Sequence, residues 1–125
     1  MPSIIYKDLF KEVNVSAIVR LSEKLYIEED FMKEGIRVYP LEIPENKLPE
    51  EHTVADFLMV CENEIIHREG VVAVHCRSGL CRTGTMIACY LMYKYNIEPK
   101  VAIAWIRMCR PGSIIGDQQQ FLINL

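Results

Sequence analysis

The sequence has no long hydrophobic run, no strong excess of one charge and no basic, apolar leader. Its apolar stretches are far shorter than the roughly 20 residues that span a bilayer, so we expect no membrane-spanning helix and no membrane partner. The opening residues, Met1-Pro2-Ser3, predict no secretory signal peptide. The net charge of -3 gives no general attraction to nucleic acid, so any affinity for phosphate must come from a local site.

The five cysteines follow neither a disulfide framework nor a metal-ligand spacing. Their number is odd and they are scattered, at Cys61, Cys76, Cys81, Cys89 and Cys109. This usage is typical of a reducing compartment, so we expect the protein in the cytosol or nucleus. Cys76 and Cys81 have no second close pair to complete a zinc site. We therefore expect no metal and no other cofactor.

The chain also lacks repeats, low-complexity stretches and long linkers, so we expect residues 1–125 to form one domain. Apolar runs predict strands at 13–21, 36–43 and 71–75. Helical spacing and helix-end residues predict helices within 22–34, 53–67, 83–95, 99–109 and 116–125. Strands that alternate with helices indicate an α/β domain with a central, mostly parallel sheet flanked by helices.

Several residues make more local predictions. Gly35 and Asn96 are expected to end helices, and Thr53 is expected to cap the start of one. The continuous apolar run at 71–75 is typical of a strand in the middle of a sheet, covered on both faces. Trp105 is expected to lie on a buried helix face together with Ile103, Ile106 and Cys109.

The turn between the third strand and the next helix contains an unusual set of residues. It reads Cys76-Arg77-Ser78-Gly79-Leu80-Cys81-Arg82. A helix start offers unpaired N–H groups and partial positive charge, which suit an anion. Gly79 allows the backbone to curl so that the N–H groups of 77–82 face one phosphate. Arg82 can bind the same phosphate with two N–H groups of its planar guanidinium.

The thiol of Cys76 supplies the chemistry. Beside a helix start and an arginine, a cysteine pKa falls from ~8.5 into a range of about 3.5–7.5, so we expect a thiolate nucleophile. Thr83 can donate its hydroxyl to the sulfur, and His75 is expected to orient the loop. The competing interpretation is a helix cap that happens to contain a buried cysteine.

The spacing His-Cys-x5-Arg-Thr, with glycine at the third x, resembles the signature of cysteine-dependent protein tyrosine and dual-specificity phosphatases. "HCRSGLCRTGTMIACYLMYKY" and "AIAWIRMCRPGSIIGDQQQFL" closely resemble the cell-division-cycle-fourteen type of this superfamily. The likeness covers nearly all of residues 6–122. It implies a minimal protein tyrosine phosphatase-like fold and hydrolysis of phosphotyrosine, with phosphoserine and phosphothreonine also open, in phosphoprotein substrates. The implied reaction passes through a cysteinyl-phosphate.

The resemblance also implies an acid and a water-positioning residue. Glu45 stands where the family has its acidic aspartate, in a loop after a strand, with Glu42, Glu50 and Glu51 as competing carboxylates. In the family, a Gln-rich segment positions the hydrolytic water, and here it would supply Gln118 or Gln119. The other interpretation of these glutamines is a polar first turn of the last helix.

Cys81 leaves two readings open, since relatives more usually have glycine or another small residue there. A thiol in this turn could trap an oxidised Cys76 as a disulfide, or it could be only a small, partly buried side chain.

Two other functions remain as alternatives. Some relatives use this loop on RNA 5′-triphosphates without a general acid, and only this alternative implies nucleic acid as a partner. It would favour basic patches, for which the sequence offers Arg77, Arg82, Arg107 and Arg110. A glutamate in place of the acidic aspartate also leaves open a phosphate-binding module with weak catalysis. The oligomeric state is not determined by any of these patterns.

Overall fold

A computed structural model describes most of the chain. The described residues are 12–24, 28–44, 47–77, 82–109, 113–114 and 118–125. Glu45, Ser78, Gly79, Leu80, Cys81 and Arg110 therefore lie outside the described residues.

Three parallel strands form the described sheet. They are β1 (Val15–Arg20), β2 (Arg37–Pro40) and β3 (Val71–His75), in the order β2-β1-β3. Both neighbours of β1 run parallel to it, so the carboxyl ends of all three strands meet at one edge of the sheet. The predicted α/β class with a parallel sheet is confirmed.

The prediction that 71–75 lies in the middle of the sheet does not hold among the described strands. Within the described sheet β1 is central and β3 lies at an edge, where Val71 is 41% exposed. A short apolar run indicates that both faces of a strand are covered by other side chains. It does not indicate how many strands lie beside it in the sheet.

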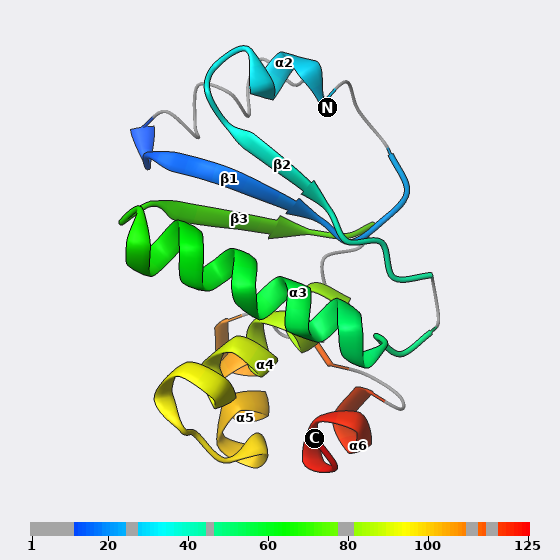
Figure 1. The fold of residues 1–125 in the computed structure, drawn as a ribbon. Helices are drawn as coiled ribbons and strands as arrows, with labels where there is room; N and C mark the ends of the chain where they lie inside the picture. Colours follow the sequence, from blue (N-terminus) through cyan, green and yellow to red (C-terminus); the bar gives the residue numbers. More distant parts are fainter. Residues whose placement is uncertain (1–11, 25–27, 45–46, 78–81, 110–112, 115–117) are drawn as a thin grey trace.

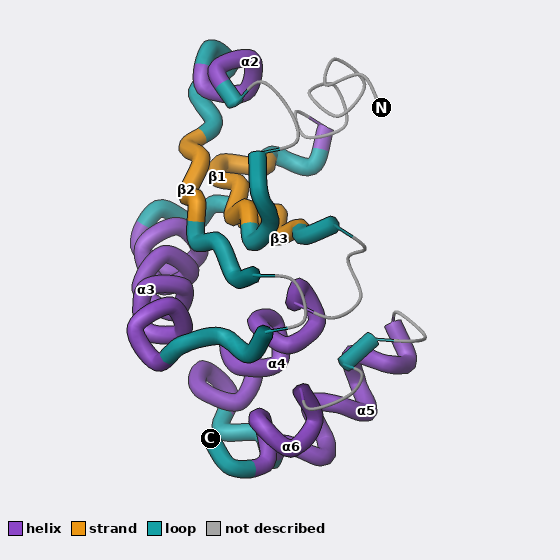
Figure 2. The backbone as a smooth tube through the Cα atoms, turned by 90° about the vertical axis from the view of Figure 1, so that its right-hand side faces the viewer, coloured by secondary structure: helices purple, strands orange, loops and turns teal. Residues whose placement is uncertain are grey.

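Helices cover both faces of the sheet unequally (Figure 1). Of the described helices, the short α2 (Glu29–Met32) lies on one face, and the longer helices lie on the other, as the rotated view also shows (Figure 2). The longer helices are α3 (Glu51–Cys61), its π-helical extension η1 (Glu62–His67), α4 (Arg82–Tyr95), α5 (Pro99–Cys109) and α6 (Gln118–Ile123). None of the described helices is both long and apolar enough to cross a membrane.

Side-chain alternation along β1 divides the core into two parts. Val19 and Leu21 point to the large core shared with α3, α4, α5 and α6, where Phe57 is also buried. Ile18 points to the opposite face and packs with Phe31 of α2. The period of two along a strand produces this division.

Two local predictions about helix ends are confirmed and one is wrong. Gly35 and Asn96 both adopt positive φ, +81° and +53°, where α2 and α4 have ended. Thr53, in contrast, does not cap α3, which begins at Glu51 with Glu50 as the flanking residue. Thr53 is instead buried inside the helix, so its burial and not a capping bond accounts for its position.

The predicted buried face of α5 is also partly wrong. Ala102, Ile103 and Ile106 face the core, but Trp105 is 60% exposed and Cys109 is exposed as well. At 3.6 residues per turn, a face centred on 102, 103 and 106 turns Trp105 outward.

An ion pair between the fully buried Glu64 and the partly exposed Arg37 joins η1 to the beginning of β2. The side chain of Glu64 has no exposed surface and accepts bonds from Arg37 Nε and Nη2, both at 2.6 Å, and from the Tyr39 hydroxyl at 2.7 Å. The bonds from Arg37, and then the one from Tyr39, outweigh burial and lower the pKa of Glu64 to about 2. The same contacts raise the pKa of Arg37 and of Tyr39.

Candidate active site

Cys76 follows directly after β3 and lies at the start of α4. Its side chain is buried, and Thr83 Oγ1, in the first turn of α4, donates a hydrogen bond to Cys76 Sγ at 3.0 Å. The turn therefore brings the predicted nucleophile and its predicted hydroxyl donor into contact. A hydrogen bond donated to sulfur favours the thiolate over the thiol.

Arg82 is the first residue of α4 and is 6% exposed. Its Nη1 donates to the carbonyl oxygens of Ile43 at 2.8 Å and Leu21 at 3.4 Å. These carbonyls follow the ends of β2 and β1, so the parallel sheet brings three segments together around one guanidinium. Because a guanidinium has five N–H donors, Arg82 can hold these carbonyls and still bind phosphate oxygens.

His75, the last residue of β3, is partly buried. Burial lowers the pKa of His75, partly offset by a hydrogen bond with the Cys76 backbone. The imidazole is therefore favoured in its neutral form, and the predicted role of His75 in orienting the loop stays a prediction.

The side chain of Arg77 pairs with a carboxylate rather than standing free to bind phosphate. Its Nη1 forms an ion pair with Glu23 Oε1, and both side chains are about half exposed. A bond from the Glu23 backbone, followed by the attraction of Arg77, lowers the pKa of Glu23. A contribution of Arg77 to anion binding would then come chiefly from its backbone N–H.

The central part of the predicted anion loop lies outside the described residues. This applies to Ser78, Gly79, Leu80 and Cys81, and equally to the predicted acid Glu45. The backbone nest, the general acid and the Cys76–Cys81 disulfide therefore stay predictions.

The three carboxylates that compete with Glu45 for the role of general acid either bind other side chains or are exposed. Glu42 Oε1 accepts from Nη1 of the buried Arg20 at 2.8 Å, and Glu28 accepts from Arg20 Nε at 2.9 Å. Burial alone would lower the pKa of Arg20, but these two glutamates reverse the effect and raise it. Glu50 Oε2 lies 3.2 Å from His52 Nδ1, and Glu51 is exposed in the first turn of α3.

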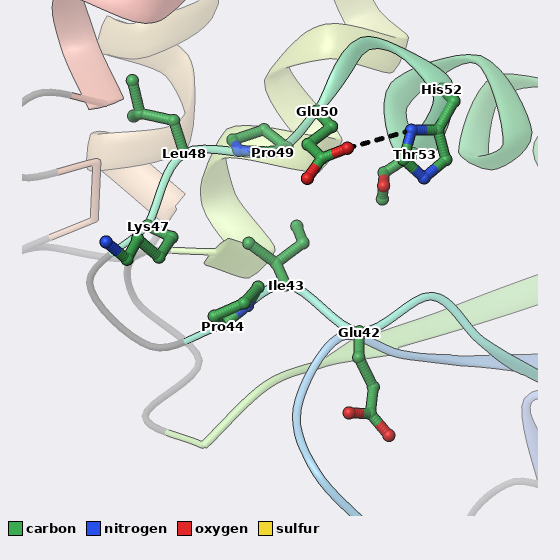
Figure 3. Close-up of a pocket in the computed structure, with 9 residues that line it drawn as sticks. All are labelled: Glu42, Ile43, Pro44, Lys47, Leu48, Pro49, Glu50, His52 and Thr53. Atoms are coloured by element: carbon green, nitrogen blue, oxygen red, sulfur yellow. Dashed lines mark ion pairs between the residues drawn. The ribbon is translucent and has the colours of Figure 1, made fainter.

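A cavity of about 470 Å³ lies along the segment that precedes α3 (Figure 3). The Glu42 carboxylate points away from Glu50 and His52 in this view. The lining residues are Glu42, Ile43, Pro44, Lys47, Leu48, Pro49, Glu50, His52 and Thr53. Since Ile43 also binds Arg82, this cavity borders the candidate site.

The two candidate glutamines have different surroundings. Gln118 is 4% exposed, and its Nε2 donates to the Lys47 carbonyl at 3.2 Å, while its buried Oε1 has no partner among the described residues. Gln119 is exposed, and its Oε1 accepts from Arg107 Nη2 at 3.0 Å. Gln118 is therefore the better placed of the two to hold a water molecule.

Two other described thiols, Cys61 and Cys89, are also buried. Burial raises the pKa of Cys61 and of Cys89 to about 12, so neither is a nucleophile at neutral pH. Within the described part of the chain, no three His, Cys, Asp or Glu side chains gather as a metal site requires.

Sequence reasoning missed the carbonyl groups that surround Arg82. Leu21 and Ile43 contribute backbone atoms, so nothing in their side chains marks them as site residues. The only available signal was that both follow strands expected to be parallel, whose carboxyl ends meet at one edge.

Residues 5–96 match a family model described as "Tc-R-P: Polymorphic toxin system, DSP-PTPase phosphatase". This match includes β3, Cys76, Arg82 and all of α4. The chain belongs to the DSP-PTPase phosphatase family.

Curated relatives support the same family. The chain is 46% identical over 118 residues to dual specificity protein phosphatase CDC14B of Mus musculus and 49% identical over 117 residues to CDC14A of Homo sapiens. Each match covers 94% of this chain but only 24% and 19% of those proteins. The chain thus spans less than a quarter of the length of these relatives. The predicted resemblance to the superfamily and to its CDC14 type is confirmed.

Solved structures have the same fold. The "active form" of the phosphatase Tk-PTP superposes with a TM-score of 0.87 at 26% identity, covering 99% of this chain and 85% of that one. A protein tyrosine phosphatase from Leishmania major gives a TM-score of 0.89 at 22% identity, covering 98% and 80%. The predicted minimal protein tyrosine phosphatase-like fold is confirmed.

Proposed function

We propose that this DSP-PTPase family member hydrolyses phosphate monoesters of proteins through a cysteinyl-phosphate. The proposal rests on one observation above all, the 3.0 Å hydrogen bond from Thr83 Oγ1 to Cys76 Sγ beside the buried guanidinium of Arg82. A thiolate stabilised by a hydroxyl and placed next to a fixed cation is suited to attack a bound phosphate dianion.

In the first step, Cys76 Sγ attacks phosphorus in line with the leaving oxygen. A P–S bond forms while the P–O bond to the substrate breaks, and a carboxylic acid gives its proton to the departing oxygen. We assign this proton to Glu45 on the family's pattern. Arg82 and the backbone N–H groups of 77–82 stabilise the equatorial oxygens, an effect usually worth several kcal/mol.

In the second step, water attacks phosphorus and the P–S bond breaks. The water proton passes to the Glu45 carboxylate, inorganic phosphate leaves, and the Cys76 thiolate is regenerated. We assign the alignment of this water to Gln118, because its side-chain oxygen is buried without a described protein partner. Gln119 is less suited, because Arg107 already occupies its side-chain oxygen.

The substrate class follows from the relatives. Those in mouse and human are named dual specificity protein phosphatases, and one in Caenorhabditis elegans, 42% identical, is named a tyrosine-protein phosphatase. We therefore infer phosphoproteins as substrates, with phosphotyrosine, phosphoserine and phosphothreonine all accepted. A thiolate-dependent enzyme of this kind fits the reducing cytosol or nucleus.

The RNA 5′-triphosphatase alternative receives no support from the described arginines. Arg77 pairs with Glu23, and Arg107 is bonded to the segment 113–119. Neither guanidinium is thus available, without losing its present contacts, to extend a basic patch around Arg82.

The first test is hydrolysis of para-nitrophenyl phosphate from pH 5 to 8 by the wild type, Cys76→Ser and Glu45→Gln. We expect Cys76→Ser to abolish turnover while circular dichroism stays unchanged. We expect Glu45→Gln to lose the basic limb of the pH profile, because that limb reports deprotonation of the acid.

A second assay separates the substrate classes. Phosphotyrosine and phosphoserine peptides and a 5′-triphosphorylated RNA are offered at equal concentration. Release of phosphate from RNA alone would replace the proposed substrate class. Retained phosphopeptide binding without release of phosphate by the wild type would identify a binding module and reject the enzyme.

A further inference from the structure

Arg107 on α5 binds a short segment that leads into the last helix. Its Nε donates to the Ser113 carbonyl at 3.2 Å and its Nη2 donates to the Ile114 carbonyl at 2.7 Å. The same Nη2 donates to Gln119 Oε1 at 3.0 Å. One guanidinium therefore joins α5 to both ends of residues 113–119, and sequence reasoning gave it no role in the catalytic reaction.

The segment that Arg107 holds is conformationally strained. Ile114 adopts φ +59° and has no exposed surface. A β-branched residue is disfavoured in this left-handed region, because its Cβ substituents crowd the backbone there. Such a conformation persists only where other contacts hold it, and the bond from Arg107 to the Ile114 carbonyl is one of them.

The held segment contacts the helix that carries Thr83. Gly84 is so close to it that an added Cβ would lie 3.3 Å from Ser113 Cβ, Ile114 Cγ1 and Ile106 Cγ2. The segment therefore packs against the first turn of α4, immediately beside the residue that donates to Cys76 Sγ.

At its far end the segment leads to Gln118. This side chain is buried, is bonded to the Lys47 carbonyl and has a side-chain oxygen without a described partner. Because Arg107 also binds Gln119, the next residue in the chain, its bonds restrict where the Gln118 oxygen can point.

We propose that Arg107 is a positioning residue for the hydrolysis of the cysteinyl-phosphate, acting on Gln118 through its bonds to Ser113, Ile114 and Gln119. This inference rests on the proposed function. Without the guanidinium, the strained turn relaxes and Gln118 shifts, so attack of water slows. Attack by Cys76 changes much less, because the bonds of Arg82 to the Leu21 and Ile43 carbonyls and of Thr83 to Cys76 Sγ do not involve the residues that Arg107 binds.

Rapid-quench kinetics with para-nitrophenyl phosphate measures the two steps separately. The burst of nitrophenol gives the rate of phosphorylation, and acid-trapped phosphoenzyme gives the rate of hydrolysis. For Arg107→Ala we expect hydrolysis to slow at least about tenfold, with phosphoenzyme accumulating and the burst rate within about twofold of wild type. Loss of folded protein would instead lower the burst amplitude without changing either rate.

A double-mutant comparison tests whether Arg107 acts through Gln118. We expect Gln118→Ala to slow hydrolysis in the same way and Arg107→Ala/Gln118→Ala to be no slower than Gln118→Ala alone. Lys100→Ala, which removes an exposed cation from the same helix, should leave both rates unchanged. If Arg107→Ala does not fold, Arg107→Lys is measured instead, because lysine keeps the charge but lacks the planar guanidinium. We expect it to slow hydrolysis of the phosphoenzyme selectively, but by a smaller factor.

Equal slowing of both steps, or additive effects of the two substitutions, would overturn the inference and leave the proposed function intact. A folded Arg107→Ala protein with the same rates of phosphorylation and of phosphoenzyme hydrolysis as wild type would also overturn the inference and leave the proposed function intact. A wild-type protein that forms no phosphoenzyme at all would reject the proposed function, and this inference with it.

Discussion

Two arginines at opposite ends of the sheet face different partners. At the beginning of β2, Arg37 is matched by the buried carboxylate of Glu64 through two 2.6 Å bonds. At the carboxyl ends of the strands, Arg82 is itself buried and its described contacts are carbonyl oxygens of Leu21 and Ile43. The first guanidinium is paired directly with a full opposite charge, whereas the hydrogen bonds of the second, among the described residues, go to carbonyl dipoles.

The difference in partners distinguishes Arg37, which belongs to a structural ion pair, from Arg82, which belongs to a candidate anion site. A carboxylate beside Arg37 satisfies its charge and would repel a phosphate group. Carbonyl groups orient Arg82 without cancelling its charge, so a phosphate dianion can still complete the site. A buried arginine is therefore informative about binding only when its partners are known.

The largest effect is expected when each of the two arginines is changed to lysine. Because lysine cannot bind phosphate through two parallel N–H groups, we expect Arg82→Lys to lower kcat/KM for para-nitrophenyl phosphate by about 10²–10³-fold. Arg37→Lys should lower the free energy of unfolding but leave turnover of the folded protein within about twofold. Equal losses of turnover would show that the two ends of the sheet do not differ in this way.

A second test breaks the structural ion pair from the acidic side. Glu64→Gln removes the charge that balances Arg37, and we expect the free energy of unfolding in urea to fall by about 2 kcal/mol. Glu62→Gln on the same helical segment is the control, because its pair with Lys94 is 3.3 Å long and part exposed. That substitution should cost less than about 1 kcal/mol.

The same pair predicts a dependence of stability on pH. The pKa of Glu64 falls from 4.5 to about 2 on folding, so its contribution is fully present above pH 4.5. It is lost progressively as the pH falls from 4.5 towards 2, because the unfolded state binds the proton first. Melting temperatures of wild type and Glu64→Gln at pH 7, 4.5 and 3 should therefore converge as the pH falls. A constant difference would contradict the shift.

The smallest expected effect comes from the hydroxyl that completes the Glu64 site. Tyr39→Phe removes the 2.7 Å bond and should lower the free energy of unfolding by about 1 kcal/mol. Tyr93→Phe, at a residue 61% exposed, should change it by less than about 0.5 kcal/mol. Turnover should be unchanged in both proteins, since neither residue is near the candidate site's described contacts.

Features that depend on neighbours in sequence were predictable. The order of strand, turn and helix around Cys76 follows from apolar runs and helix-start signals, and positive φ at Gly35 and Asn96 follows from residue type. Trp105 was misplaced because an amphipathic helix with apolar residues on both sides does not reveal which side faces the core.

Sequence alone was enough to predict the parallel α/β class and the short stretch that carries Cys76, Arg82 and Thr83, because these residues fall within eight consecutive positions between a predicted strand and a predicted helix. The contacts of Arg82 with Ile43, 39 residues away, and of Gln118 with Lys47, 71 residues away, arise only in the folded chain. The same holds for the pairing of Glu64 with Arg37 across 27 residues. Such pairs depend on how strands and helices pack, and local periodicity contains no record of that packing.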